Sequence, residues 1–153
     1  MTVQKVAAGL LVRDGRILLG HRAAWKSNWP NHWDAIGGRL EPGETADRAL
    51  IREVQEEIGV RVLKAAFLSD IEHRAMPNGT AFLSAIFAVL EWSGGEPANI
   101  CDEHSEIRWF VPDEIDSLDA LAHPDYRKLA RRALALFQGA GRAQPCNLPP
   151  DRS

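Results

Sequence analysis

The chain of 153 residues has the length of one domain with a substantial core, since single domains usually hold about 100–200 residues. Apolar residues make up 45% and charged residues 25% of the chain, as in ordinary soluble globular proteins. The formal net charge of -3 argues against a nucleic-acid polymer as partner, because such partners call for a concentrated basic surface.

The N-terminal part of the chain predicts a β-hairpin followed by a loop. Residues 3–12 are apolar and β-branched enough for a strand, and residues 17–19 resume a strand after an Asp-Gly turn signal. Residues 21–32 are rich in Trp, Asn and Pro, which predicts a loop, and residues 33–36 predict a short strand.

A helix is predicted over residues 45–58. Residues 37–43 contain paired glycines and a Pro-Gly step, which indicate a tight loop before this helix. Thr45 can cap the helix, and Gly59 is a typical C-terminal stop.

The remaining chain predicts three strands and two helices. Residues 60–70 and 80–92 have strand composition and flank a Pro-Asn-Gly turn, and residues 107–111 form a short apolar strand. Residues 112–118 begin with proline and predict a short helix, whereas residues 125–137 have the periodicity of an amphipathic helix.

This order of elements predicts the α/β class, with a central mixed sheet covered by helices on both faces. We expect a single domain over residues 1–138. Residues 139–153 are rich in Gly, Pro and polar side chains, so we expect a flexible C-terminal tail there.

Acidic side chains lie beside the apolar face of the helix predicted over residues 45–58. At about 100° per residue the apolar stripe consists of Ala46, Leu50, Val54 and Ile58. With Leu50 as reference, Glu57 falls at about -20°, Glu53 at about -60° and Glu56 near -120°. Glu53 and Glu57 therefore border the stripe one turn apart.

Two like charges one turn apart repel, and partial burial opposes ionisation. A hard cation removes both penalties, and Mg²⁺ is commonly shared between carboxylates and a phosphate. We therefore expect a metal between Glu53 and Glu57, with Glu56 able to hold a second. The alternative is a solvated helix with an Arg52–Glu56 ion pair and no metal.

The segment over residues 38–60 reads GRLEPGETADRALIREVQEEIGV and resembles the signature of the Nudix hydrolase family. Every defining position of G-x5-E-x7-R-E-U-x-E-E-x-G-U is met, U being aliphatic. The positions are Gly38, Glu44, Arg52, Glu53, Val54, Glu56, Glu57, Gly59 and Val60. Ile36 departs from the proline that many members carry there. The element order looks like the Nudix-type α/β/α sandwich over residues 3–138.

The resemblance implies a Mg²⁺-dependent enzyme, with Mn²⁺ as a substitute, that hydrolyses a nucleoside diphosphate linked to another group. The implied metal ligands are Gly38 through its carbonyl, Glu53, Glu56, Glu57 and Glu103. The implied catalytic residues are Glu53, Glu56, Arg52 and Glu103. Arg52 would orient a carboxylate while paired with Glu44, and Glu44 and Gly59 would support the loop and helix.

Residues outside the signature complete the predicted site. Family members often place an acidic metal ligand or base in the region of Glu103, with Glu106 as the reserve; a solvated loop carboxylate is the alternative. Arg22 and Arg39 are candidates for the substrate phosphates, since a guanidinium suits that task. Some aromatic residues either pack in the core or stack on a base: Trp25, Trp29, Trp33, Phe82 and Trp92.

The resemblance favours a pyrophosphohydrolase that converts a (deoxy)nucleoside triphosphate, oxidised or not, to monophosphate and pyrophosphate. The alternatives are an ADP-ribose or nucleoside diphosphate sugar hydrolase, and an inactive Nudix-fold binding module. We expect a small nucleotide as partner, no membrane, and a monomer or homodimer. With no signal peptide and no close pairing of Cys101 and Cys146, we expect a cytoplasmic protein with reduced thiols.

Overall fold

The computed structural model describes residues 3–75 and 79–138, which form seven strands and three helices. The strands are β1 (Val3–Arg13), β2 (Arg16–Arg22), β3 (Trp33–Asp34), β4 (Ile36–Arg39), β5 (Arg61–Ala75), β6 (Thr80–Ser93) and β7 (His104–Phe110). The helices are α1 (Ala46–Ile58), α2 (Pro112–Asp116) and α3 (Tyr126–Gln138). Within the described residues, no helix has the length and apolarity to cross a membrane.

The seven strands form one mixed sheet. Its order is β3-β2-β1-β6-β5, with β4 also paired to β1 and β7 to β2. β1 and β6 run parallel from Val3↔Ala81 to Leu11↔Val89, whereas the other pairs are antiparallel. Residues 7–12 of β1 are all buried, because this strand lies inside the sheet and is covered on both sides.

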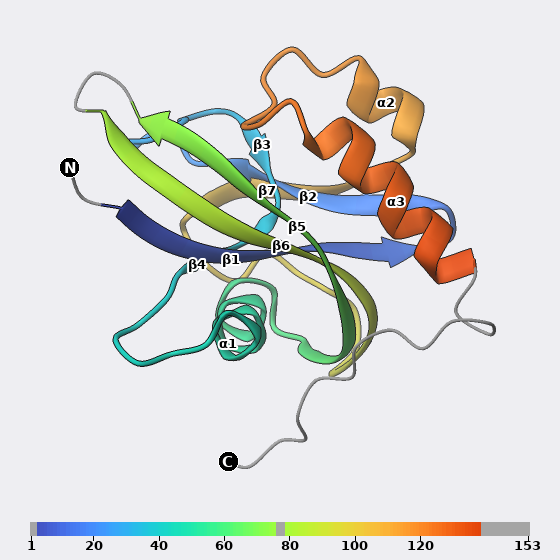
Figure 1. Ribbon diagram of the computed structural model, residues 1–153. Coiled ribbons are helices and arrows are strands. Elements are labelled where there is room, and N and C mark those ends of the chain that lie inside the picture. The colour runs from blue at the N-terminus through green and yellow to red at the C-terminus, as the bar shows by residue number, and fades with distance from the viewer. Residues whose placement is uncertain (1–2, 76–78, 139–153) are drawn as a thin grey trace.

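Helices cover both faces of the sheet (Figure 1). Successive side chains of a strand point to opposite faces, so Leu10 joins the core cluster that contains Leu129 of α3. Leu11 joins the other cluster, which contains Leu50 of α1. This α/β/α arrangement with a mixed sheet confirms the predicted fold class.

The prediction that Gly37 and Gly38 lie in a tight loop is wrong, because both belong to β4. They pair with Ala8 and Ala7 of β1. A Cβ atom on Gly37 would overlap the backbone oxygen of Ala7. Glycine is thus needed here for the close approach of two strands rather than for a turn.

Three strands are longer than the sequence predicts, because they pair with neighbouring strands. β2 continues through Arg22, inside the predicted loop, because it pairs with β7, and β7 itself begins at His104. β5 reaches Ala75 because it pairs with β6 along its length. The predicted turn residues Pro77 and Asn78 and the predicted tail over residues 139–153 lie outside the described residues.

Candidate active site

Helix α1 carries the acidic residues of the site. It begins after Thr45 and ends at Gly59, whose left-handed φ of 75° lets its N–H donate to the carbonyl oxygen of Gln55 at 3.1 Å. Glu57, which is predicted to border the apolar stripe, is buried at 1% exposure. The segment before β7 lies against this end of the helix, since the N–H of Ile100 donates to the carbonyl oxygen of Glu57 at 3.2 Å.

Three carboxylates from distant parts of the chain meet at this helix. One oxygen from each of Glu53, Glu57 and Glu103 lies within 4.8 Å of the others. Burial, followed by the hydrogen bond and the charge of Glu53, raises the pKa of Glu57 well above its usual range. The Oε2 atom of Glu57 is buried without a hydrogen-bond partner among the described residues.

These three glutamates fit a hard divalent cation. Their ligand atoms are all carboxylate oxygens, which Mg²⁺ and Mn²⁺ prefer. The Oε2 atom of Glu57 has no hydrogen-bond partner among the described residues, so it is available as a metal ligand. Gly38 leaves the room that Glu53 needs, since a Cβ atom there would lie 2.6 Å from Glu53 Cδ. The backbone of Gly38 therefore lies close to the carboxylate of Glu53.

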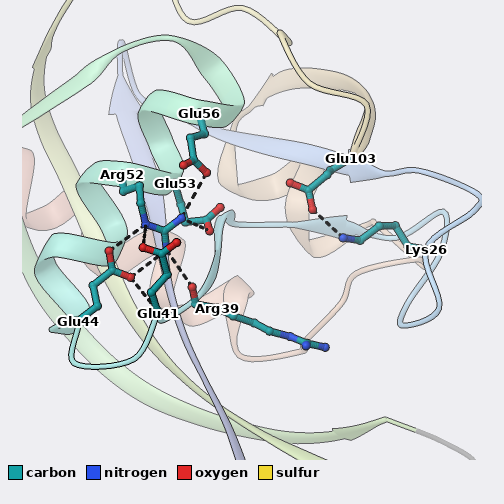
Figure 2. Close-up of polar contacts among 8 residues, drawn as sticks. All are labelled: Lys26, Arg39, Glu41, Glu44, Arg52, Glu53, Glu56 and Glu103. Carbon is teal, nitrogen blue, oxygen red and sulfur yellow. Dashed lines mark hydrogen bonds and ion pairs between the residues drawn. The ribbon is translucent and has the colours of Figure 1, made fainter.

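Arg52 holds this part of the site in place (Figure 2). Its guanidinium donates two hydrogen bonds of 2.8 Å to Glu44, one of 2.9 Å to Glu53 and one of 3.0 Å to the carbonyl oxygen of Arg39. The hydrogen bond from Arg52 lowers the pKa of Glu44, and the same contact raises the pKa of Arg52. The pairing of Arg52 with Glu44 that the family resemblance implies is therefore present.

The other two candidate acids lie apart from the cluster of three. Glu56 has a side chain that is 57% exposed, and it contacts Arg52 at 3.3 Å. It borders the same cavity as Glu53 but is not within the 4.8 Å group. Glu106, the reserve for Glu103, contacts Arg108 at 2.6 Å and does not border the cavity.

The loop between β2 and β3 adds a lysine that the sequence analysis missed. Lys26 Nζ donates a hydrogen bond of 2.8 Å to Glu103 (Figure 2). Burial acts to raise the pKa of Glu103, but the hydrogen bond and charge of Lys26, together with the charges of His104 and Arg22, lower this pKa overall. Lys26 and Glu103 are 77 positions apart, so no local pattern could have indicated their contact.

His104 contacts the buried carboxylate from the other side. Its Nε2 atom lies 3.2 Å from Glu57 Oε1, and its Nδ1 atom lies 3.8 Å from the Sγ atom of Cys101. A Cβ atom on Gly20 would lie 2.6 Å from the His104 ring, so glycine provides the space for this ring. Burial lowers the pKa of His104 and raises that of Glu57, which disfavours an ion pair between them.

We expect replacement of His104 to change activity through Glu57. His104→Phe keeps a ring of similar shape but removes Nε2, and should reduce kcat/KM by about 10-fold, the lower end of the range for partners of metal ligands. His104→Gln retains an N–H donor and should recover part of the loss. Steady-state kinetics at equal folded fraction checks this, and equal kcat/KM in the three proteins would contradict a positioning role for His104.

A cavity of about 420 Å³ adjoins the carboxylates. Its lining includes Glu53 and Glu103 and also the aromatic residues Trp29, His73 and Phe82. Trp29 is stacked on His73 with ring centroids 4.4 Å apart. A volume of this size is typical of small-molecule sites, which occupy about 300–1,000 Å³.

Both candidate phosphate-binding arginines border this cavity. Arg22 is already engaged, since it contacts Asp34 at 3.3 Å and donates to the carbonyl oxygen of Asn28 at 2.9 Å. Asp34 also accepts a hydrogen bond of 2.6 Å from the buried hydroxyl of Tyr126. Arg39 has its guanidinium 5.9 Å from the ring of Phe82, so it faces the same space.

The remaining aromatic candidates lie elsewhere. Trp33 is buried in the core, and Trp92 is stacked against Trp109 at 6.2 Å. Trp25 is 62% exposed and donates a hydrogen bond to the carbonyl oxygen of Asp102. Of the five tryptophan and phenylalanine candidates, Trp29 and Phe82 thus border the cavity.

The sandwich, the signature helix and the carboxylate cluster define a Nudix hydrolase. The family model described as the NUDIX domain matches residues 3–133. The chain therefore belongs to the NUDIX domain family.

Relatives with known names agree with this assignment. The chain is 31% identical to a CTP pyrophosphohydrolase of Escherichia coli (strain K12), over 74% of this chain and 80% of that protein. It is 30% identical to the nucleoside triphosphatase NudI of Enterobacter sp. (strain 638), over 78% of this chain and 89% of that protein. The crystal structure of a MutT NUDIX hydrolase from Burkholderia pseudomallei superposes with a TM-score of 0.73 at 29% identity, covering 88% of this chain and 98% of that one.

Proposed function

We propose that this protein is a Mg²⁺-dependent pyrophosphohydrolase that converts a nucleoside triphosphate to a monophosphate and pyrophosphate. The observation that carries the proposal is the shared cavity, which Glu53 and Glu103 border together with Trp29 and Phe82. A site for a nucleotide needs such a combination: ligands for a cation that neutralises phosphate charge, and flat apolar faces for a base.

Each residue of the site has a role in this proposal. Glu53, Glu57 and Glu103 would hold the cation, with Gly38 adding its carbonyl oxygen and Glu56 able to hold a second cation. Arg52, fixed by Glu44, orients Glu53. A divalent cation in this position supplies charge neutralisation and lowers the pKa of a water nucleophile. Arg22 and Arg39 face the phosphates from the cavity wall.

The nucleoside specificity rests on the aromatic side of the cavity and on the named relatives. Trp29, stacked on His73, offers a face on which a base can pack. Two relatives are named for activity on nucleoside triphosphates. ADP-ribose and nucleoside diphosphate sugars are the alternative substrates, because the same cation site serves any diphosphate linkage.

Product analysis over a nucleotide library tests the proposal. The library contains the common and oxidised (deoxy)nucleoside triphosphates, ADP-ribose and nucleoside diphosphate sugars, each with Mg²⁺ or Mn²⁺. We expect pyrophosphate and a nucleoside monophosphate from at least one triphosphate. Release of AMP and ribose phosphate from ADP-ribose, with no turnover of triphosphates, would replace the proposal with the alternative.

A matched pair of variants assigns the activity to the site. Glu53→Gln removes a carboxylate of the cluster and should reduce kcat by about 10²-fold or more, the scale of losing one group that stabilises the transition state. Glu106→Gln removes an exposed carboxylate outside the cavity and should leave kcat unchanged. Equal activity of Glu53→Gln and wild type would disprove the metal-site assignment.

A further inference from the structure

We propose that Lys26 is a ligand of the substrate phosphates that stays on Glu103 until a divalent cation takes that carboxylate. The proposal rests on the function proposed above, because it assumes that Glu103 binds the cation. It assigns to Lys26 two successive partners, first a carboxylate of the site and then the polyphosphate.

The geometry puts Lys26 at the point where cation and phosphates would meet. Its Nζ atom lies 2.8 Å from Glu103 Oε1, and an oxygen of Glu103 lies within 4.8 Å of oxygens of Glu53 and Glu57. The lysine side chain is 21% exposed and borders the cavity that also contains Arg22 and Arg39. The ammonium group of Lys26 therefore contacts the same carboxylate that a cation bound to Glu103 would contact.

Lys26 can leave Glu103 without unfolding the loop that carries it. Two other contacts hold the loop to the segment before β7: the N–H of Ala23 donates to the carbonyl oxygen of Glu103 at 2.9 Å, and Trp25 Nε1 donates to that of Asp102 at 3.1 Å. The lysine ammonium is a point charge on a flexible stem. The loop can therefore stay in place while the side chain turns into the cavity.

Electrostatics determines the direction of this movement. A cation at Glu103 competes with Lys26 for the same oxygen atoms and repels the ammonium group. A polyphosphate in the cavity attracts it, since phosphate oxygens accept charge-assisted hydrogen bonds. Lys26 thus opposes cation binding in the empty site and favours phosphate binding in the loaded site. Lys26 therefore makes the binding of cation and phosphate more cooperative, because linkage between two sites is reciprocal.

Two binding measurements test the proposal with Lys26→Met. Mn²⁺ alone, titrated by electron paramagnetic resonance, should bind the variant about three- to tenfold more tightly than wild type, because its competitor is gone. Inorganic imidodiphosphate, a pyrophosphate analogue that resists hydrolysis, should bind the Mn²⁺-saturated variant about tenfold more weakly in calorimetry. We therefore expect the affinities for Mn²⁺ and imidodiphosphate to shift in opposite directions.

Two further variants serve as controls. Lys64→Met removes a lysine that forms a similar 2.9 Å ion pair with Glu91 but does not border the cavity, and it should change neither affinity. Lys26→Arg keeps the charge and should restore Mn²⁺ affinity to the wild-type value. These variants separate a local effect of Lys26 from a general change in net charge.

Each contrary result has a distinct meaning. If Lys26→Met binds Mn²⁺ with unchanged or weaker affinity while wild type binds it, Lys26 is only a tether between loops and the inference is overturned. If the affinities for Mn²⁺ and imidodiphosphate shift in the same direction, Lys26 does not move from Glu103 to the phosphates, and the inference is also overturned. If wild type binds no Mn²⁺, the cation site of the proposed function fails first.

Discussion

Glu57→Gln is expected to stabilise the metal-free protein at neutral pH and to reduce hydrolysis by about 10²-fold or more. Glu57 is 1% exposed, and its Oε2 atom lacks a hydrogen-bond partner among the described residues. Ionising such a group costs free energy unless a nearby cation or hydrogen bonds offset it. A glutamine has nearly the same shape as glutamate and carries no charge.

The sign of the pH dependence follows from the raised pKa of Glu57, which burial and then Glu53 cause. The unfolded chain loses this proton near pH 4.3, the approximate value for free glutamate, while the folded protein still holds it. The folded state then binds more protons, so the free energy of unfolding falls as the pH rises through this range. Glu57→Gln removes this decrease, and its advantage in Tm should be larger at pH 7.5 than at pH 4.

Differential scanning fluorimetry, with and without Mg²⁺ and at both pH values, measures the Tm of wild type and of Glu57→Gln. Mg²⁺ should raise the Tm of wild type, since a ligand that binds only the folded state stabilises it, and should have little effect on Glu57→Gln. Glu56→Gln is the control, because Glu56 is largely exposed and its metal-free Tm should change little. A lower Tm for metal-free Glu57→Gln than for wild type at pH 7.5 would contradict the expectation that ionisation of Glu57 destabilises the folded protein.

Local patterns in the sequence were sufficient for the acidic helix and its ends. The spacing of Leu50, Val54 and Ile58 indicates the buried face, and all three are fully buried. Thr45 is the N-cap residue by position, although its side chain makes no capping hydrogen bond, and Gly59 ends the helix in the left-handed region. These features are local, so the chain around them specifies them without tertiary information.

Contacts between distant segments could not be read in the same way. The parallel pairing of β1 with β6 places residues near position 3 beside residues near position 81. This pairing helps to bring Phe82 to the wall of the cavity that Glu53 also borders. Lys26 enters the site from the loop between β2 and β3, and His104 enters it as the first residue of β7, so both positions depend on such pairings. Their residue types alone are equally compatible with a solvated surface.

Gly37 and Gly38 show why a glycine pattern is ambiguous until the fold is known. The sequence predicts both in a tight loop, yet neither has the positive φ that a loop glycine often needs. Each is instead required by a neighbour: a backbone oxygen of Ala7 for Gly37, and the carboxylate of Glu53 for Gly38. The two positions therefore predict different consequences for the same substitution.

Gly37→Ala should destabilise the fold, whereas Gly38→Ala should mainly disable the site. At Gly37 the added methyl group meets the backbone of Ala7 and the Cα atom of Ala8 at 2.5 Å. Paired strands cannot yield, so we expect a loss of about 3 kcal/mol or more in the free energy of unfolding. At Gly38 it meets Glu53 Cδ at 2.6 Å, the end of a side chain that can rotate away. The fold should then lose under about 1 kcal/mol, while kcat falls by about 10²-fold.

Urea unfolding, Mn²⁺ titration and kcat measured on both variants distinguish these effects. Gly38→Ala should unfold near the wild-type midpoint but bind Mn²⁺ more weakly, because Glu53 no longer reaches the oxygens of Glu57 and Glu103. Wild-type kcat and Mn²⁺ affinity in Gly38→Ala would show that Glu53 is not held where the cation binds. Wild-type stability in Gly37→Ala would contradict the pairing of β4 with β1. Because the residues are adjacent and the substitution is identical, a difference between the variants can only come from what each methyl group meets.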